Sequence, residues 1–471
     1  MKTAVILAAG LGTKMWPFAE VRPKAMIPVG TKPIIAHQVD SLIELGFARI
    51  VIVGGKLHGQ IRNYFRENGL HSGAEQDAEI IVVADEKGQG TAISLTAARS
   101  AVGGEGAFLV LYGDTLIETA DIKLLMSAFE GRSEHELAAA LVNPLEQQSP
   151  SDWICCKLSE DGRKIRYIMG HPRGDYTHRF CGYAFDEKFW SYASSNSGLF
   201  TSVQVGMMPP LEAHLEMSLL DSMHDGYAVR AVETTGGFVD LDKPWHILLA
   251  NELVSRRNCA KLTEHVLAEG ASIDPSASID GFVQLGARSR IGRNVIIEGN
   301  IIVGDDTVIE NGAILKGNHI IGNDTYIGNY CFLSEGTTVG NKCVINHCAE
   351  LEGVIFDTVY LYHYMEFYGV IGTATDLGAA TVCGTLRFDD GQTAHRIKGR
   401  KETPREHSDA IYLGDFVRTG VNAILMPGVK VGVYSVVGSG VILEEDVPNR
   451  TMLYVKQDLV RKEWGPSRYG W

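Results

Sequence analysis

Basic residues are scarce in this 471-residue chain: 43 Lys and Arg stand against 57 Asp and Glu, for a formal net charge of −14. A nucleic-acid backbone or an acidic membrane surface attracts a positively charged partner. The chain also lacks an uninterrupted apolar stretch long enough to span a bilayer. We therefore expect neither nucleic acid nor membrane among its partners, whereas a small anionic substrate in a locally positive pocket fits the same balance.

Zinc-binding and export patterns are missing as well. None of the eight cysteines lies in a C-x-x-C pair with matching Cys or His partners, which excludes the common structural zinc sites. The apolar start KTAVILAAG runs into a glycine-containing loop without a cleavage site, unlike a signal peptide. We expect a cytoplasmic protein with reduced thiols.

What is present falls into two regions of different pattern. Over residues 1–254, short runs rich in Val, Ile and Leu that end in Gly or Asp alternate with amphipathic helical stretches. Buried parallel strands separated by helices predict a Rossmann-like, doubly wound α/β domain, whose ligands bind beyond the carboxyl ends of the strands. We expect a linker helix over 255–267, an all-β second domain over 268–447 and a tail over 448–471.

The second domain is marked by an aliphatic residue at every sixth position. The unbroken series is Ile273, Ile279, Leu285, Ile291, Ile297, Val303, Ile309, Leu315, Ile321, Ile327, Leu333, Val339, Ile345 and Leu351. A period of six with recurring glycine fits neither a helix nor an ordinary strand, and it is typical of a β-helix of hexapeptide repeats. The series resumes at Leu413, after a less regular stretch through Val359, Met365, Ile371, Leu377 and Cys383. We predict that the polar segment 385–409 is a loop insert and that the tail covers the end of the solenoid.

A glycine loop follows the first apolar run, in the string LAAGLGTKMWPFAEVRPKAMIPV. Gly10 and Gly12 allow backbone N–H groups to approach a phosphate, and Lys14 and Lys24 add positive charge nearby. The spacing is neither that of a P-loop nor that of a dinucleotide fingerprint. The loop predicts a phosphate site, with a simple tight turn as the alternative.

The strings LAAGLGTKMWP and RPKAMIPV resemble the sugar-1-phosphate nucleotidylyltransferase family, which makes nucleotide sugars. The resemblance spans nearly the whole chain and is closest to the bifunctional nucleotidylyltransferase/acetyltransferase members, which carry a left-handed parallel β-helix. It implies that the nucleotide lies against Leu7, Ala8, Ala9, Gly10, Gly12 and Thr13. Lys14, where the family usually has Arg, would neutralise the departing pyrophosphate, and Lys24 would hold the phosphate that nucleotide and sugar share.

Two carboxylates complete the implied catalytic set. Asp114 ends the run FLVLYGD and Asp240 lies in GGFVDLDKPWHILLAN. The resemblance makes them the ligands of a Mg²⁺ ion, with Asp242 as the alternative to Asp240. The implied reaction is in-line attack of a sugar-phosphate oxygen on the α-phosphorus of an NTP, for which positioning and charge suffice. The alternative is that both residues are solvated acids at strand ends.

The nucleobase contacts are less clearly marked. The string VVADEKGQGTA matches the family's base-contacting stretch through Gly90 and Thr91, and Asp85 stands where uridine and thymidine enzymes carry Gln. A carboxylate only accepts hydrogen bonds, which suits the two adjacent donors of guanine. We therefore predict GTP over UTP or dTTP, with Glu86 as the alternative contact.

At the sugar pocket the sequence departs from the family. Gly170, His171 and Pro172 replace a Glu-Lys-Pro motif, and the usual Asn-x-Gly motif is blurred around 179–182. The sugar-binding residues that we expect are His171, Gly182 and Glu216. His171 would either replace the missing Lys or be a surface histidine. The substrate would then be an unusual sugar-1-phosphate or another phosphorylated alcohol.

The resemblance also implies a role for the solenoid. Two-domain members assemble as homotrimers through it, and some use acetyl-CoA to acetylate an amino sugar. His363 falls where the acetylating base would lie, but Glu366, Asp376 and Thr385 replace a Tyr and two Asn. These replacements argue against acetyl transfer, with packing at a coil edge as the alternative role of His363. Three functions are therefore open: a nucleotidylyltransferase, a bifunctional enzyme, and a non-catalytic regulator that binds nucleotide sugars.

Overall fold

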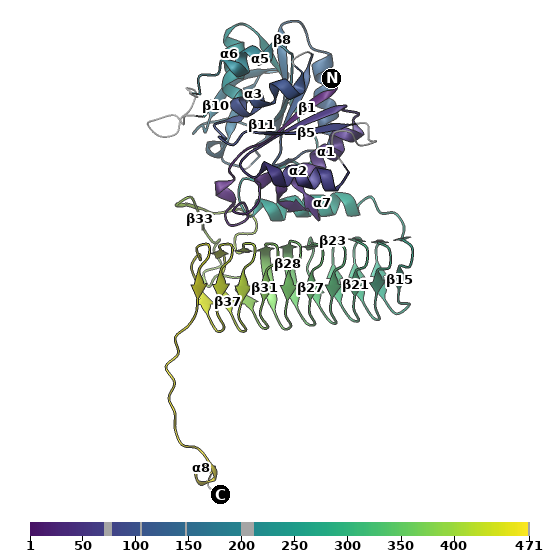
Figure 1. Ribbon diagram of the computed structural model, residues 1–471, viewed down its shortest axis with the longest axis vertical. Helices are drawn as coiled ribbons and strands as arrows, with labels where there is room; N and C mark the ends of the chain where they lie inside the picture. The colour runs from purple at the N-terminus through teal and green to yellow at the C-terminus, as the bar shows by residue number, and fades with distance from the viewer. Residues whose placement is uncertain (70–77, 104–105, 147, 199–211, 470–471) are drawn as a thin grey trace.

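The computed structural model describes the chain except for residues 70–77, 104–105, 147, 199–211 and 470–471. An α/β domain lies along one face of a long β-solenoid, and the carboxyl-terminal end of the chain extends away from both (Figure 1). Within the described part, no helix has the length and apolar character needed to cross a bilayer. The predicted combination of an α/β domain with a parallel β-solenoid is confirmed.

The α/β domain is built on a nine-stranded sheet with the order β10-β9-β11-β6-β1-β4-β5, in which β8 lies beside β11 and β12 beside β8. Its strands are β1 (Thr3–Ala8), β4 (Arg49–Gly54), β5 (Glu79–Ala84), β6 (Phe108–Tyr112), β8 (Glu136–Pro144), β9 (Ile154–Leu158), β10 (Ile165–Gly170), β11 (His178–Phe185) and β12 (Ala228–Glu233). Strands β1, β4, β5 and β6 are parallel, as predicted, whereas β11 runs antiparallel to β6. The sheet is therefore mixed, which an alternation of strands and helices in the sequence does not reveal.

Helices cover both faces of this sheet, and each face has its own apolar core. They are α1 (Ile34–Glu44), α2 (His58–Glu67), α3 (Thr91–Val102), α4 (Thr119–Glu130), α5 (Phe189–Ser194) and α6 (Leu215–His224). Strand β1 is buried along nearly its whole length, which explains its continuous run of apolar residues. The loops at its carboxyl end are consequently held by a rigid strand.

Short parallel strands stack in three columns to form the solenoid. The first column contains β15 (Ser272–Ile273), β18 (Arg290–Ile291), β21 (Val308–Ile309), β24 (Tyr326–Ile327), β27 (Val344–Ile345), β29 (Tyr360–Leu361), β31 (Asp376–Leu377), β36 (Arg418–Thr419), β39 (Val436–Val437) and β41 (Met452–Leu453). The second contains β14 (Val266–Leu267), β17 (Val283–Leu285), β20 (Ile301–Val303), β23 (His319–Ile321), β26 (Thr338–Val339), β35 (Ile411–Leu413) and β38 (Lys430–Val431). The third contains β16 (Ser278–Asp280), β19 (Ile296–Glu298), β22 (Ile314–Lys316), β25 (Phe332–Leu333), β32 (Val382–Cys383), β37 (Ile424–Leu425) and β40 (Ile442–Leu443).

The period of six follows from this architecture, because one coil passes through three columns. Equivalent groups lie 18 residues apart, as in the hydrogen bond from the Asn323 N–H to Asn341 Oδ1. From Leu285 to Leu351, every member of the predicted series is at most 2% exposed. Their side chains form one continuous apolar core inside the prism.

Two longer strands explain where the frame becomes irregular. β28 (Glu350–Ile355) and β30 (Glu366–Ile371) each pair with strands of both the second and the third column. Partner residues in this part, such as Leu351 and Phe367, are 16 rather than 18 positions apart because the corner is shortened. The repeat therefore continues through Leu361 and Phe367, not through Val359 and Met365 as the sequence frame predicted, although the latter pair is also buried.

The shortened corner depends on glycine. Gly353 and Gly369 have φ values of 115° and 135°, which residues with a side chain rarely adopt. A Cβ atom on Gly369 would lie 2.0 Å from the carbonyl oxygen of Ile411 in the next coil. These glycines allow β28 and β30 to turn the corner while remaining paired.

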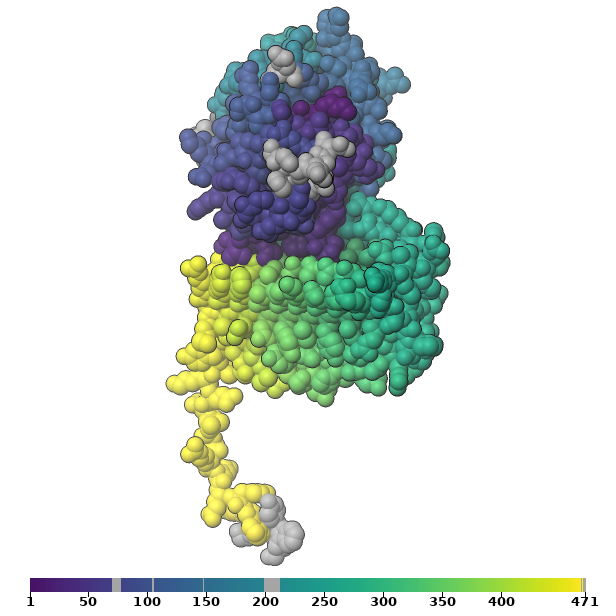
Figure 2. Space-filling view, turned by 45° about the vertical axis from the view of Figure 1, so that its right-hand side comes forward, coloured from purple at the N-terminus to yellow at the C-terminus, as the bar shows by residue number. Residues whose placement is uncertain are grey.

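A buried apolar cluster joins the two domains. Helix α7 (His246–Cys259) lies between the sheet and the solenoid (Figure 1). The ring of Phe18 packs 5.6 Å from that of Phe356 and 6.3 Å from that of Tyr412. The amino-terminal segment, purple in Figure 2, rests directly on the solenoid face. The loop after β1 is therefore positioned by both domains.

Two segments differ from the sequence prediction. A helix is expected over 255–267, whereas α7 begins at His246, packs its apolar residues from Ile247 to Val254 into the interface and ends at Cys259. The tail adds β41 to the first column and then extends away to α8 (Pro466–Tyr469) instead of covering the solenoid end (Figure 1). Apolar side chains along it are exposed, among them Val460 at 83%.

Candidate active site

The glycine loop begins where β1 ends. Gly12 has a φ of 64° and precedes the short 3-10 helix η1 (Thr13–Met15), and a Cβ atom there would lie 2.9 Å from that of Ala19. Gly10 has no neighbouring atom within 4 Å of its Cβ position, so no internal packing explains the glycine. The loop thus has a fixed turn at Gly12 and an open backbone at Gly10. Leu7, Ala8, Ala9 and Thr13 lie in the same segment, and their contacts with a nucleotide stay predictions.

The two predicted metal ligands converge on one lysine. The hairpin-like pair β7 (Thr115–Leu116) and β13 (Val239–Asp240) brings the ends of separate chain regions together, and the Leu241 N–H donates to the Asp114 carbonyl at 3.0 Å. Lys24, at the start of η2 (Lys24–Met26), places its Nζ 2.6 Å from Asp114 Oδ2 and 3.6 Å from Asp240 Oδ1. The structure therefore gathers Lys24, Asp114 and Asp240 in one cluster.

Electrostatics in this cluster are dominated by burial and by excess negative charge. Burial raises the pKa of Asp240 to about 6; Lys24 opposes this rise, and the neighbouring Asp114 adds to it. Burial alone would lower the pKa of Lys24, but the surrounding carboxylates raise it above its usual value. Closely spaced carboxylates of this kind are stabilised by an additional cation.

A second cluster contains Lys14. Its Nζ lies 3.1 Å from Asp242 Oδ2, which is also 3.1 Å from the Nζ of Lys243. Burial would raise the pKa of Asp242, but these lysines and Lys24 hold it well below its usual range. Lys14 is thus paired with Asp242, which separates the roles of the two nearby aspartates: Asp240 faces Lys24, and Asp242 faces Lys14.

Arg179 lies beside the first cluster. The sequence placed it in the blurred Asn-x-Gly segment but assigned it no role. It lies on β11, only 3% exposed, and its guanidinium stacks 3.8 Å from the Trp153 ring and 4.6 Å from the Phe238 ring. Its Nη1 is 3.8 Å from Asp240 Oδ2, and among the described residues neither Nη1 nor Nε has a hydrogen-bond partner. A buried cation with unused donors beside the aspartate cluster marks an anion-binding position.

The predicted base contacts are tied to helix α3. Asp85 Oδ2 accepts a hydrogen bond from Ser94 Oγ at 2.7 Å, and Thr91 Oγ1 accepts one from the Leu215 N–H at 2.9 Å. Gly90 has a φ of 117° and leaves no room for a side chain against the backbone of Ala213. All three residues therefore have internal structural roles, and their contacts with a base stay predictions. Glu86 follows Asp85 and is exposed.

Of the predicted sugar contacts, Glu216 has the most distinctive environment. It is 3% exposed, and its Oε1 accepts hydrogen bonds from Tyr112 at 2.8 Å and Tyr183 at 2.5 Å. Its Oε2 has no partner among the described residues, which leaves one acceptor for a ligand hydroxyl. Gly182 packs against β6, with its Cβ position 2.9 Å from Leu111 Cδ2, so internal packing already explains this glycine.

His171 does not provide the charge of the lysine that the family carries. Its Nδ1 lies 2.9 Å from the Ser151 carbonyl oxygen, to which a protonated Nδ1 donates. Burial lowers the pKa of this imidazole, so the ring is neutral at neutral pH. A neutral imidazole lacks the charge of a lysine, and the charge of Lys14 further disfavours protonation of His171.

The residues present fit a Mg²⁺ ion that phosphate oxygens help to hold. Among the described residues, no cluster of three or more His, Cys, Asp or Glu side chains forms a complete metal cage. Mg²⁺ is commonly bound by one or two carboxylates together with substrate phosphates and water. Asp114 and Asp240 supply two such carboxylates; burial raises the pKa of Asp240, and the negative charge of Asp114, which a cation would offset, adds to that rise.

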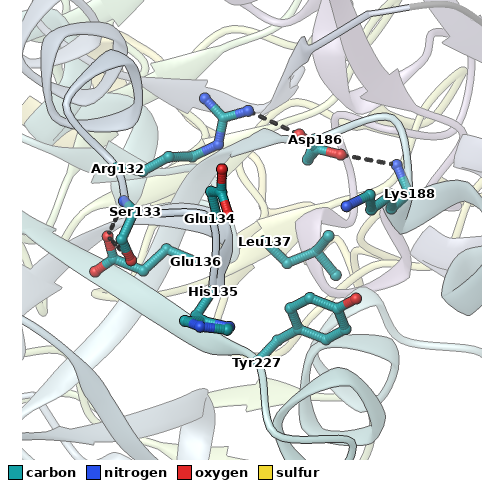
Figure 3. Close-up of a pocket in the computed structure, with 9 residues that line it drawn as sticks. All are labelled: Arg132, Ser133, Glu134, His135, Glu136, Leu137, Asp186, Lys188 and Tyr227. Carbon is teal, nitrogen blue, oxygen red and sulfur yellow. Dashed lines mark hydrogen bonds and ion pairs between the residues drawn. The ribbon is translucent and has the colours of Figure 1, made fainter.

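A hollow of about 690 Å³ lies elsewhere on the α/β domain. In Figure 3 the Arg132 guanidinium pairs with Asp186 at 2.7 Å, and Asp186 also accepts a hydrogen bond from the Lys188 backbone N–H. None of the site residues above lines it. Its size alone does not make it a functional site.

Two family models match the chain. Residues 4–177 match the MobA-like NTP transferase domain, and residues 262–359 match the GMPPB C-terminal domain. The bifunctional protein GlmU of Methanococcus maripaludis (strain C7) is 31% identical over 461 residues, which covers 97% of this chain and 98% of that protein. The chain belongs to the GlmU family. A bifunctional sugar-1-phosphate nucleotidylyltransferase/acetyltransferase of Sulfurisphaera tokodaii is 25% identical over 457 residues, 94% of this chain and 98% of the relative.

Membership of the GlmU family confirms the enzyme class predicted from the resemblance of LAAGLGTKMWP and RPKAMIPV to nucleotidylyltransferases. The α/β domain is a nucleotidyltransferase domain, and the chain is a sugar-1-phosphate nucleotidylyltransferase. Both regions of the chain lie within the matched length of these relatives. The roles of individual residues rest on the geometry described above.

His363, at the position of the acetylating base in the solenoid, packs against other aromatic rings. The imidazole of His363 stacks on that of His347 with centroids 5.0 Å apart, and it contacts the Tyr364 ring edge at the same distance. Glu366 is close to Glu350, and burial together with that neighbour raises its pKa. Asp376 Oδ1 is buried without a hydrogen-bond partner among the described residues. This geometry agrees with packing of His363 at a coil edge.

Proposed function

We propose that the α/β domain joins the nucleoside monophosphate part of an NTP to a sugar-1-phosphate and that Lys24, Asp114, Asp240 and Arg179 carry the reaction. The observation on which this depends is the convergence of both aspartates on Lys24 beside the glycine loop. An oxygen of the sugar phosphate forms a bond to the α-phosphorus, the bond between the α- and β-phosphates breaks, and pyrophosphate leaves with the electron pair.

The protein groups act by position and charge. Lys24 binds the α-phosphate that becomes shared between nucleotide and sugar, and Arg179 orients the sugar phosphate for in-line attack with its unused donors. The loop backbone at Gly10 and Gly12 binds the remaining phosphates. Bound to Asp114 and Asp240, Mg²⁺ would supply charge neutralisation as pyrophosphate forms.

The proposed nucleotide is GTP, with UTP or dTTP as the alternative. In support of this choice, the Asp85 carboxylate accepts hydrogen bonds from Ser94 Oγ and the Gly88 N–H. Acceptors favour the donor edge of guanine. We further propose that the free oxygen of Glu216 binds a sugar hydroxyl.

A panel of NTPs and sugar-1-phosphates, with pyrophosphate release as the readout, tests this proposal. We expect Mg²⁺-dependent turnover with at least one pair and the highest kcat/KM with GTP. Binding of nucleotide sugars without pyrophosphate release by any pair would instead support a non-catalytic regulator. A preference for UTP or dTTP would contradict the role of Asp85 but not the reaction.

We propose that the solenoid assembles the chain into a homotrimer. Large apolar side chains are exposed on it, including Tyr330, Tyr360, Tyr362, Tyr364, Phe416 and Tyr434. Two of them, Phe416 and Tyr434, stack with centroids 4.6 Å apart. Exposed apolar groups that gather in this way mark contact surfaces between proteins. Sedimentation equilibrium is expected to give the mass of three chains, and a monomer would contradict the assembly.

Acetyl transfer is the second candidate function, and family membership alone favours it. Acetyl-CoA would be its cofactor and an amino-sugar phosphate its acceptor. Because His363 stacks on His347 and acids replace neutral donors nearby, we expect no acetyl-CoA-dependent thiol release by the trimer with glucosamine-1-phosphate. Thiol release that is lost on substitution of His363 by Ala would overturn this expectation and establish a bifunctional enzyme.

A further inference from the structure

A two-stranded hairpin leaves the solenoid and reaches the α/β domain (Figure 1). It consists of β33 (His395–Ile397) and β34 (Arg400–Glu402), within the predicted loop insert. Lys398 and Gly399 at its turn have φ values of 48° and 81°, as in the tight two-residue turns that suit the twist of paired strands. The insert is therefore a built element with a defined tip.

Its inner side is anchored in the domain interface. His395 is 1% exposed and lies 5.3 Å from the Trp245 ring and 5.6 Å from the Tyr412 ring. Ile397 belongs to the interdomain apolar cluster. Glu402 ends the hairpin with an ion pair of 2.7 Å to Lys243. These contacts fix the hairpin relative to the nucleotide loop.

Its outer side carries a surplus of positive charge. Arg396, Lys398, Arg400 and Lys401 are exposed, and none of them forms an ion pair or a hydrogen bond with another side chain in the described part of the chain. Arg396 and Lys401 are direct cross-strand partners, and like charges opposite each other destabilise a strand pair. In a protein with a net charge of −14, four such neighbouring cations create a locally positive surface that attracts anions.

The tip faces the glycine loop. A cavity of about 270 Å³ is lined by Thr13, Lys14, Trp16, Glu20, Arg396, Ile397 and Lys398. Its one acid, Glu20, already accepts a hydrogen bond of 2.7 Å from Asn449 Nδ2. After His214, the charge of Lys398 also helps to lower the pKa of Glu212. The basic tip thus lies across the opening between the loop and the chain that precedes α6.

The hairpin is also connected to Lys14 by charge. Glu402 pairs with Lys243, Lys243 with Asp242, and Asp242 with Lys14. Lys14 is consequently held towards Asp242, and its side chain is 40% exposed. A chain of alternating charges therefore runs from the solenoid insert to the nucleotide loop.

We propose that this hairpin completes the triphosphate site, with Arg396 and Lys398 binding the β- and γ-phosphates of the nucleotide and the pyrophosphate that leaves. The inference rests on the proposed nucleotidyl transfer and extends it, because it makes the solenoid part of the catalytic site. The two cations add to the single charge of Lys14, which is shared with Asp242. The ligand class is a polyphosphate, whether it enters as NTP or leaves as pyrophosphate.

The double variant Arg396→Gln/Lys398→Gln tests the proposal in the full-length protein. We expect KM for the NTP in synthesis and KM for pyrophosphate in the reverse reaction each to rise about 10- to 100-fold, since two charge-assisted contacts are lost. KM for the sugar-1-phosphate and the affinity for nucleoside monophosphate should stay within about twofold. An unchanged KM for both polyphosphates would overturn the proposal.

Arg400→Gln/Lys401→Gln is the matched control, because it removes the same charge from the same hairpin. Both residues line a neighbouring cavity with Trp153 and Lys243 rather than the cavity at Thr13. We expect this pair to change KM for the NTP by less than about threefold. Equal effects of the two pairs would show that overall charge acts instead of contact, and would also overturn the proposal. Failure of the wild-type protein to turn over any substrate pair would contradict the proposed function itself.

Discussion

Replacing Asp114 or Asp240 by Asn is expected to lower kcat/KM for nucleotidyl transfer by about 10³-fold or more, because a bound metal ion contributes several kcal/mol to charge stabilisation. Each substitution removes one anionic oxygen from the two-carboxylate set and leaves the ammonium of Lys24 with a single carboxylate partner. Pyrophosphate release measured over a series of Mg²⁺ concentrations should show that the remaining activity needs more metal. The amide is nearly isosteric with the carboxylate, so we expect the fold to be retained.

Asp242→Asn provides a control two residues from Asp240. Asp242 contacts Lys14 and Lys243 but is not an ion-pair partner of Lys24. We expect a loss of only about 10-fold, through the altered position of Lys14. Turnover by Asp114→Asn within tenfold of the wild-type rate, with an intact thermal transition, would show that these aspartates do not hold the metal.

The solenoid was predictable from sequence because its geometry repeats. An inward position returns every six residues, so each of the aliphatic residues from Leu285 to Leu351 is independent evidence for the same fold. The shift of the repeat by two residues after Leu351 could not be predicted. Two glycines shorten the corner there without altering the polarity of the residues around it. The antiparallel strand β11 was missed for a similar reason, since strand direction leaves no mark in hydrophobic pattern.

Within the site, residues in continuous motifs were predicted and residues assembled by tertiary contacts were not. Lys24, Asp114 and Asp240 lie in recognisable strings, and the structure brings them together. Arg179 lies in a segment without a clear motif, and its significance comes from Trp153, Phe238 and Asp240, which are distant in sequence. The sequence signal that could have pointed to another cation is that His171 stands where the family carries a lysine.

The same limit applies to the solenoid insert. Its length and polarity predicted a loop, but a sequence does not show which part of another domain a loop approaches. The ion pair from Glu402 to Lys243 and the burial of Ile397 decide this, and both depend on how α7 rests on the prism. The solenoid therefore contributes to the site through an irregular segment rather than through its repeats, which is common for functional loops on regular scaffolds.

Arg179→Met is expected to lower kcat/KM for the sugar-1-phosphate by about 10³-fold, and Arg179→Lys by about 10²-fold, because a lysine keeps the charge but loses the planar fork that stacks and donates twice. The guanidinium lies between Trp153 and Phe238 with unused donors, next to Asp240. The affinity for the NTP should change little. Initial rates with each substrate varied in turn separate the two effects.

Arg132→Met is the matched control for this prediction. Arg132 also stacks on an aromatic ring, at 3.8 Å from Phe129, and pairs with an aspartate at 2.7 Å, but it lines the hollow in Figure 3 and not the site. Both variants lose a stacked cation and an ion pair, so thermal unfolding of each measures the loss of stability separately from the kinetic effect. A selective rise in KM for the sugar-1-phosphate in the Arg179 variants alone assigns the phosphate contact to that residue. Equal kinetics of Arg179→Met and Arg132→Met would show that Arg179 only supports the fold, and the sugar phosphate would then need another cation.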